Sequence, residues 1–253
     1  GDEIIASIPA YDFETDKNIV IASKQGMIKR SKIKDFKLLR YTKATSCMKL
    51  KDDDEVITAF VDNKNTIFTT TNSGYGLSFN IEEIPIVGVK ASGVKAMKLK
   101  DDYLVSVNNF DYTEDEFISV ITEKGTGKRI RLTEFELSTR ARRGLLLLRE
   151  VKSNPYHILK TFIEDNRTYI GLKNGDINTI KITELSIADR YSTGSSISKH
   201  ELTDCFVVAT LTSNKREEQE NKVEDEKEEV PKKDQISLKE IDDRLMTIDD
   251  FLK

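Results

Sequence analysis

The stretch IVIASKQGMIKRSKIKDF, residues 19–36, decides the fold. It begins with a run of β-branched residues, turns at Gly26, and continues as a second run in which apolar and polar residues alternate. Two such runs joined by a polar turn with glycine predict a β-hairpin. Glycine suits the turn because tight turns need a positive φ that other residues adopt only at a cost.

The hairpin pattern recurs three more times, in TIFTTTNSGYGLSFNIEEI (66–84), FISVITEKGTGKRIRLTEFE (117–136) and TYIGLKNGDINTIKITELS (168–186). The turn glycines are Gly26, Gly74, Gly125 and Gly175, at intervals of 48, 51 and 50 residues. An apolar strand precedes each hairpin, at 3–11, 55–61, 103–110 and 156–163, and a fifth copy at 204–211 has no hairpin after it.

A repeat of about 50 residues with several strands per unit indicates an all-β radial array of small sheets, not a sandwich. We therefore predict a propeller-like disc of about four repeats plus a closing strand, in which neighbouring repeats complete each other's core. The trailing strand 204–211 has two possible uses. It either pairs with an element from the start of the chain or seals the last blade, which would protect an edge from aggregation.

The sequence divides into three predicted regions. Residues 1–213 form the disc, residues 214–235 a disordered acidic linker almost without apolar residues, and residues 236–253 a short amphipathic helix. The last 40 residues carry nine basic and fourteen acidic side chains, which leaves 31 basic and 30 acidic ones in residues 1–213. The helix either docks on its own domain, or stays unstructured, or binds a partner or competes for the basic surface of the disc.

Basic residues cluster within the near-neutral disc. Eight lie between Lys24 and Lys43 against one acid, eight between Lys124 and Arg149 against two, and four between Val87 and Lys100 against none. A neutral total can therefore conceal a polarised surface. The alternative is that these cations decorate exposed strands without any partner, since isolated surface charges act weakly.

Several classes of protein are excluded or disfavoured. Two cysteines and two histidines cannot form a disulfide scaffold or a cysteine zinc site, and they suit the reducing cytoplasm. The apolar runs are shorter than a membrane span, no signal peptide is visible, and the absence of an initiator Met suggests a cut within a longer protein. Gly125-Thr126-Gly127-Lys128 lacks the spacing of a phosphate-binding loop. We predict no catalytic residue and no metal site.

Three segments together resemble one family: SKQGMIKRSKIKDF (23–36), VGVKASGVKAMKLKDDYLV (87–105) and STRARRGLLLLREVKSNPY (138–156). They are similar to the C-terminal domain of the A-type subunits of bacterial type IIA topoisomerases, specifically that of topoisomerase IV of the Gram-positive type. The resemblance extends over about residues 1–212. It implies a β-pinwheel, a disc of four-stranded blades that exchange strands with their neighbours.

The resemblance also implies a role. Domains of this family bind double-stranded DNA without sequence specificity and bend or wrap it around a basic outer rim, which presents a DNA segment to the catalytic core for decatenation and supercoil relaxation. The parent enzyme hydrolyses ATP with Mg²⁺ in other domains and forms an A2B2 heterotetramer with the B-type subunit of topoisomerase IV. It is cytoplasmic, associated with the nucleoid, and does not cross a membrane. The present chain would itself need no cofactor.

Two features depart from the family pattern. The glutamine-arginine-arginine-glycine-glycine box of gyrase is absent, which favours topoisomerase IV and leaves the gyrase A C-terminal domain as the alternative. Family members of this type resemble six-bladed discs, whereas four repeats are present here. Either the first blades are missing or this disc is smaller.

Basic residues that recur after the hairpin glycine and in the following connector are the candidate DNA contacts, because a rim of cations neutralises phosphates without reading bases. They are Lys29, Arg30, Lys32, Lys90, Lys95, Lys128, Arg129, Arg131, Arg140, Arg142 and Arg143. Arg129 and Arg131 could instead make cross-strand ion pairs. A protein-interaction propeller is the competing class, but it would favour exposed aromatic residues, and this chain has no tryptophan.

Overall fold

In the computed structural model the chain divides into two units, residues 1–211 and 212–253. The structure describes residues 3–10, 12–37, 44–51, 53–112 and 116–211. The predicted linker and terminal helix lie outside these residues. The described part of the chain is all-β with short 3-10 turns, and it contains no helix that could span a membrane.

The four predicted hairpins are present. They are β1–β2 (Asn18–Ser23, Met27–Lys32), β4–β5 (Thr66–Thr71, Tyr75–Asn80), β8–β9 (Phe117–Thr122, Thr126–Arg131) and β12–β13 (Thr168–Lys173, Ile177–Lys181). Each turn glycine has the expected positive φ, at 85°, 94°, 69° and 107° along the chain. A 3-10 turn follows each hairpin: η1 (Ile33–Phe36), η2 (Ile81–Glu83), η3 (Leu132–Glu134) and η4 (Ile182–Glu184).

The apolar strands pair with the hairpin that precedes them, not with the one they were expected to lead. β3 (Val56–Val61) pairs with β1, β7 (Leu104–Phe110) with β4, β11 (Ile158–Phe162) with β8, and β15 (Asp204–Thr210) with β12. The trailing strand therefore seals the last blade, the second of its two predicted uses. Residues 3–10 form no strand, and no hairpin precedes them in this sequence.

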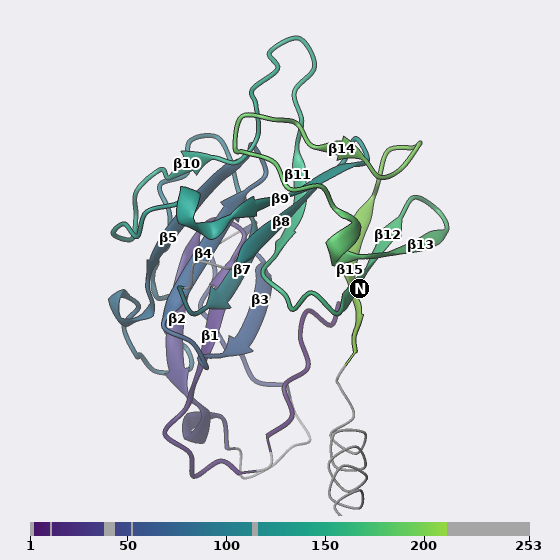
Figure 1. Ribbon diagram of the computed structural model, residues 1–253. Helices are drawn as coiled ribbons and strands as arrows, with labels where there is room; N and C mark the ends of the chain where they lie inside the picture. The colour runs from purple at the N-terminus through teal and green to yellow at the C-terminus, as the bar shows by residue number, and fades with distance from the viewer. Residues whose placement is uncertain (1–2, 11, 38–43, 52, 113–115, 212–253) are drawn as a thin grey trace, which may run out of the picture. The chain divides into compact units, whose positions relative to one another are not determined.

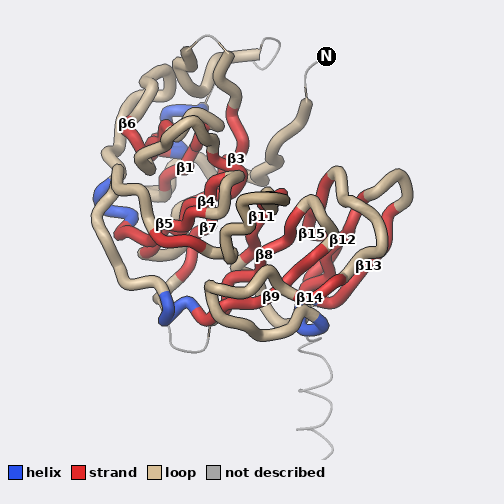
Figure 2. Tube along the Cα trace, turned by 90° about the horizontal axis from the view of Figure 1, so that it is seen from above, coloured by secondary structure: helices blue, strands red, loops and turns tan. Residues whose placement is uncertain are grey.

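Three very short strands complete the exchange between neighbours (Figures 1 and 2). β6 (Val94–Lys95) pairs with β2, β10 (Leu145–Leu146) with β5, and β14 (Ser195–Ser196) with β9. Each comes from the connector that follows the next hairpin, so each connector returns to the outer edge of the blade before it. The sheets, which we call blades A to D, have the orders β3-β1-β2-β6, β10-β5-β4-β7, β11-β8-β9-β14 and β13-β12-β15.

Blade D has three strands instead of the predicted four. Its outer strand β13 receives no connector among the described residues, and Ile177 at its start is 57% exposed. The turn glycine Gly175 has open space around it, whereas a Cβ on Gly26 in blade A would lie 2.9 Å from Leu99 of a connector. Blade D is thus the only described blade with a bare outer edge.

The core lies between blades. One cluster joins blades A and B through Ile28 and Phe79, and a second joins B and C through Phe68 and Ile130. A third cluster joins blades C and D. This arrangement explains why a single repeat cannot bury its own apolar face and why the pattern must be repeated.

Candidate nucleic-acid interface

The connectors form the outer edge of blades A, B and C. After η2, η3 and η4 the chain runs alongside the second hairpin strand of the preceding blade, with parallel bridges at Arg30–Ile86, Phe79–Ser138 and Arg129–Ile187. It then loops outward and returns as the short strand. Most of the predicted cations lie on these connectors or on the strands beneath them.

Lys29 and Lys128 do not belong to the exposed surface. Both side chains are fully buried, and both ammonium groups donate to backbone carbonyls of the overlying connector. Lys29 Nζ donates to Gly88 and Val89, and Lys128 Nζ donates to Asp189 at 2.6 Å and to Ser192 at 2.8 Å. Burial lowers the pKa of Lys29, and it lowers the pKa of Lys128 to about 8. The structure thus places these two predicted DNA contacts beneath connectors, with their ammonium groups already bound to backbone carbonyls and not exposed to a phosphate.

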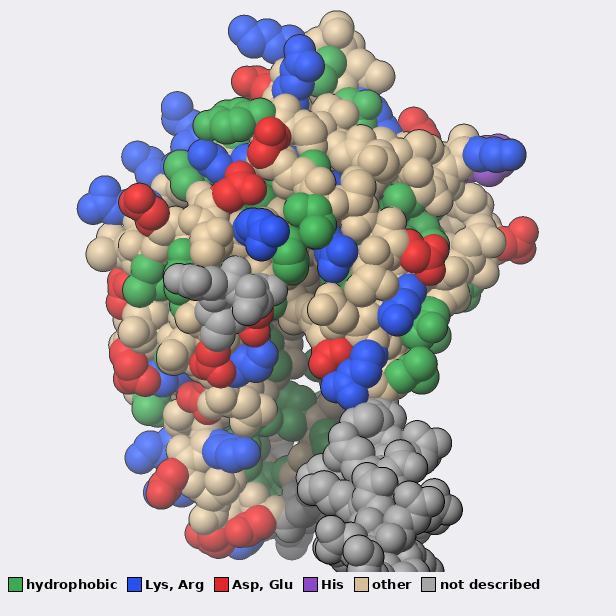
Figure 3. All heavy atoms as spheres, in the orientation of Figure 1, with side chains coloured by type: hydrophobic (Ala, Val, Ile, Leu, Met, Phe, Trp, Pro, Cys, Tyr) green, Lys and Arg blue, Asp and Glu red, His purple; other side chains and the backbone are tan. Residues whose placement is uncertain are grey.

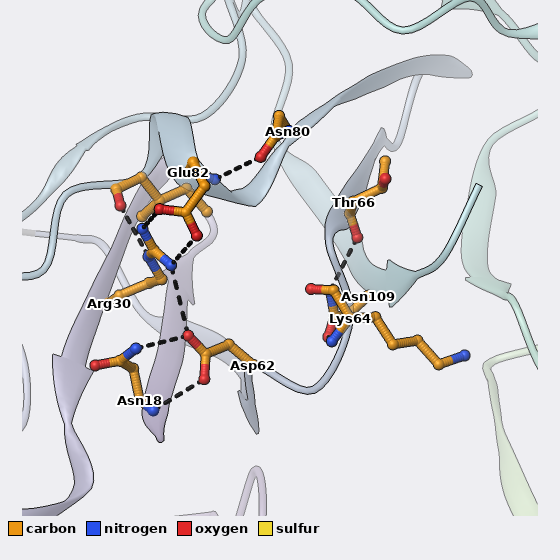
Figure 4. A network of polar contacts seen from close by, with 9 residues as sticks. Asn18, Arg30, Asp62, Lys64, Thr66, Asn80, Glu82 and Asn109 are labelled. Atoms are coloured by element: carbon orange, nitrogen blue, oxygen red, sulfur yellow. Dashed lines mark hydrogen bonds and ion pairs between the residues drawn. The ribbon is translucent and has the colours of Figure 1, made fainter. Parts of the chain in front are cut away.

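Arg30 is also buried and belongs to a polar network (Figure 4). Its two terminal nitrogens donate to the carboxylate of Glu82 at 3.1 Å each, and Nη1 lies 3.6 Å from Asp62. Asp62 in turn accepts from the backbone and side-chain nitrogens of Asn18 at 2.9 and 2.8 Å. Arg30 beside it lowers the pKa of Glu82. A guanidinium bound in this way is not free for a phosphate, in contrast to the role that the sequence predicted for Arg30.

Arg129 and Arg131 flank an aromatic ring. Their guanidinium groups lie 5.1 and 5.2 Å from the centre of the Phe117 ring, and Phe117 pairs with Arg131 across the hairpin. Arg129 also donates to the carbonyl of Leu185 at 3.2 Å and to Asn166 at 3.3 Å. The cross-strand partner of these arginines is therefore a ring and not a carboxylate.

The remaining candidates lie at the surface. Lys32, Lys90, Lys95 and Arg142 are exposed, and Arg140 and Arg143 are partly exposed. Arg143 lies 4.1 Å above the ring of Tyr75, and Arg142 donates to Thr139 at 2.9 Å.

Two neighbouring connectors bring five cations together. Lys98 N donates to the carbonyl of Arg142 at 2.9 Å, and Ala141 N donates to Ala96 at 2.9 Å. The Arg140 guanidinium donates to the carbonyls of Glu83 and Lys95. We call the resulting surface the rim strip, and its members are Lys95, Lys98, Arg140, Arg142 and Arg143. In Figure 3, Lys and Arg side chains gather on the side of the molecule where Figure 1 places β10.

Two further sets of residues position the connectors and were not predicted. Gly93, Gly144 and Gly194 precede the short strands with positive φ, and a Cβ on Gly144 would lie 2.1 Å from the carbonyl oxygen of Gly76. Glu83 and Glu134, in equivalent 3-10 turns, accept from the backbone nitrogens of Arg140 and Arg190. The regular intervals of 51 and 50 residues between these glycines were the available signal.

The described residues contain no group of three or more His, Cys, Asp or Glu side chains that could hold a metal ion. Cys205 is buried, which raises the pKa of its thiol to about 12, so it is not a ready nucleophile. The rim strip, with its five neighbouring cations, is therefore the candidate binding site of the described surface.

Comparisons with known proteins agree with this architecture. The family model "DNA gyrase C-terminal domain, beta-propeller" matches residues 17–61, 65–110 and 116–150. The A-type subunit of DNA topoisomerase 4 from Bacillus subtilis is 36% identical over 77% of this chain, and its counterpart from Staphylococcus epidermidis is 32% identical over 78%. The chain spans about a quarter of the length of these relatives, 24% and 25% respectively.

Solved structures show the same fold. The C-terminal domain of DNA topoisomerase IV superimposes with a TM-score of 0.78 at 36% identity, covering 88% of this chain and 70% of that one. A DNA gyrase A C-terminal domain, at 18% identity and a TM-score of 0.67, covers 79% of this chain and 68% of its own. The chain therefore belongs to the family of DNA gyrase and topoisomerase IV C-terminal β-propeller domains.

Proposed function

We propose that this domain binds double-stranded DNA without sequence specificity and bends it along the connectors of blades A, B and C. The observation that carries the proposal is the rim strip, where two connectors place five cations side by side. None of the five has an ion-pair partner among the described residues. Cations without acidic partners are available to phosphates, and each phosphate contact releases counterions.

The distribution of cations supports bending of the DNA along an extended path in preference to binding at a single point. Cations extend from Lys90 over blade A to Arg142 over blade B. Over blade C, Arg190 takes the place of Arg140 but is paired with Glu134 at 3.8 Å, so this blade offers a weaker contact. Smooth bending of a duplex by tens of degrees costs a few kcal/mol, and contacts spread along the bend can offset that cost. Blade D has no connector on its outer edge among the described residues, and we place the end of the DNA path there.

We further propose that the domain serves a topoisomerase IV, presenting a DNA segment to the catalytic core for decatenation and supercoil relaxation. In that setting the B-type subunit, ATP and Mg²⁺ act elsewhere in an A2B2 enzyme, at the nucleoid in the cytoplasm. The support is the name shared by the relatives that are 31–36% identical. A gyrase role is less well supported, since the similar gyrase structure is only 18% identical.

A salt titration of DNA binding tests the DNA proposal. The full chain is compared with Arg142→Glu/Arg143→Glu on the rim strip and with Lys173→Glu/Lys181→Glu on blade D, which changes the charge equally. The slope of log K against log salt should be about −3 or steeper for the wild type, since each phosphate contributes about −0.9. The rim variant should flatten this slope and the blade D variant should not. Equal losses of DNA affinity in both variants, or binding that does not depend on salt, would refute the proposal that the rim strip binds DNA.

A further inference from the structure

Three exposed aliphatic side chains occur at one position of the repeat. Ile86, Leu137 and Ile187 are 45%, 53% and 52% exposed, and they are separated by 51 and 50 residues. We call them the aliphatic row. All three lie on connectors, at or next to the parallel bridges on the outer edges of blades A, B and C.

The backbone holds the aliphatic row firmly. The residue after each member donates its N–H to the second hairpin strand: Val87 to Arg30 at 2.8 Å, Ser138 to Ser78 at 2.8 Å, and Ala188 to Arg129 at 2.9 Å. In blades A and C the buried lysines fasten the same connectors a few residues further on. These side chains are therefore presented from ordered backbone.

The core does not require apolar residues at these positions. Two residues before each member, a different apolar side chain enters the core: Ile84 is 0% exposed, and Phe135 and Leu185 are 1% exposed. Single exposed apolar residues are ordinary in soluble proteins. Three at one repeat position, each next to a side chain that already serves the core, indicate a use at the surface.

Each member has a cation nearby in the sequence. Lys90 follows Ile86 by four residues, while Arg140 and Arg190 follow Leu137 and Ile187 by three. Lys90 and Arg140 have no ion-pair partner among the described residues, whereas Arg190 is paired with Glu134 at 3.8 Å. An apolar side chain beside a cation suits DNA, because the cation binds a phosphate while an aliphatic wedge presses between base steps of the minor groove and bends the duplex. Such a wedge makes no hydrogen bond to a base, so it is compatible with binding that ignores sequence.

We propose that Ile86, Leu137 and Ile187 are DNA-bending wedges, one for each connector-bearing blade. The inference rests on the proposed DNA binding and adds a second, salt-independent contribution to it. Cations set the salt dependence, whereas the aliphatic row sets the bend and part of the affinity.

A duplex labelled at both ends for energy transfer tests this division. Ile86→Ala/Leu137→Ala/Ile187→Ala should bind roughly ten- to a hundredfold more weakly and bend the duplex less, with the salt slope of the wild type. Ile4→Ala/Ile177→Ala/Val208→Ala, which truncates exposed aliphatic residues outside the row, is the matched control and should behave as the wild type. Thermal melting of both triples checks that they fold.

A fluorescent reporter tests contact directly, because the chain has no tryptophan. DNA should quench Leu137→Trp through contact with bases and leave Ile177→Trp unchanged. Wild-type bending and affinity in the row variant, or equal quenching of the two tryptophans, would overturn the inference. Failure of the wild type to bind DNA in a salt-dependent way would instead refute the proposed function itself.

Discussion

The hairpins of blades A and C carry the same Lys-Arg dipeptide at the same position, and its lysine and its arginine Nε make the same contacts in both blades. Lys29-Arg30 and Lys128-Arg129 both begin three residues after the turn glycine. In each hairpin the lysine fastens the connector loop, and the arginine Nε donates to the carbonyl at the end of a 3-10 turn. These hydrogen bonds to backbone carbonyls recur in blades A and C although their connectors differ in sequence, because any residue of a connector can supply a carbonyl.

The outer half of the arginine differs between the two blades. Arg30 is held by Glu82 and Asp62, and Asp62 is held by Asn18. The corresponding residues around Arg129 are Thr183, Glu164 and Phe117, judged from the aligned strands and turns.

Blade C therefore lacks the closed network of blade A. It has instead a polar cavity of about 280 Å³, lined among others by Lys64, Glu116, Arg129 and Glu164. Oε2 of Glu116 is buried there without a hydrogen-bond partner, and burial raises the pKa of this carboxyl. The charge network is thus a local addition to a shared backbone framework.

The sharpest way to break the comparison is to replace each arginine by methionine. Both variants leave an equivalent 3-10 carbonyl without its donor, but only Arg30→Met leaves the buried Asp62 without its cation. We expect a loss of about 3–5 kcal/mol in unfolding free energy for Arg30→Met. Arg129→Met should cost about 1 kcal/mol, because it loses only hydrogen bonds and a ring contact. Urea denaturation measures both, and equal losses would mean that the network adds nothing.

The buried lysine of blade C predicts a dependence on alkaline pH. Its pKa of about 8 lies below the ordinary 10.5, so the unfolded chain keeps this proton to higher pH than the folded one. Folding stability should therefore rise between pH 8 and 10.5 and show no such gain below pH 8. The neutral amine can still donate to Asp189 and Ser192.

Urea titrations of the wild type and Lys128→Met near pH 7 and near pH 9.5 measure this effect. The difference in unfolding free energy between the two proteins should grow by about 2 kcal/mol in favour of the wild type. A constant difference would show that Lys128 keeps its proton throughout this range. Lys29→Met should show a change of the same sign in blade A.

The sequence was sufficient for the elements of the fold that depend on local patterns. Hairpins follow from alternation and from glycine with positive φ, and both features are visible in residues 19–36 and their copies. Strand pairing between repeats was not visible, because β3 has the same composition whether it pairs forward or backward. The bare edge of β13 was likewise not visible, because it follows from the path of the connectors, none of which reaches β13 among the described residues.

Site residues were harder to predict for a specific reason. Lys29, Lys90 and Lys128 are alike as letters, and only the path of the connector decides which ammonium group is buried. Where apolar and polar residues alternate along a strand, a basic residue suggests an exposed side chain. A buried lysine whose ammonium group binds backbone carbonyls produces the same alternation. The aliphatic row was not predicted for the same reason: Ile84 and Ile86 are identical in the sequence, and only the path of the connector decides that Ile84 enters the core while Ile86 is exposed.

A smaller effect on stability is expected at the polar cavity of blade C, where Glu116 lies. Glu116→Gln removes a carboxylate that is costly to bury, and it should raise stability near pH 7 by less than about 1 kcal/mol. Because the folded pKa is raised, the carboxyl destabilises the protein above the titration range and ceases to do so once it is protonated in both states. The gain should therefore disappear as the pH falls below the ordinary pKa of 4.5. A gain that persists at acid pH would point to packing instead.

The smallest effect would come from building the network of blade A into blade C. Thr183 occupies the place of Glu82, the second residue of its 3-10 turn, and is partly exposed. Thr183→Glu should offer Arg129 a bidentate carboxylate and stabilise the domain by about 0.5 kcal/mol, since exposed pairs contribute little. A double-mutant cycle with Arg129→Met isolates this term, and Glu82→Thr in blade A is the reverse exchange. A coupling energy near zero in blade C, with a clear one in blade A, would show that the glutamate is effective only where Asp62 and Asn18 already hold the arginine in place.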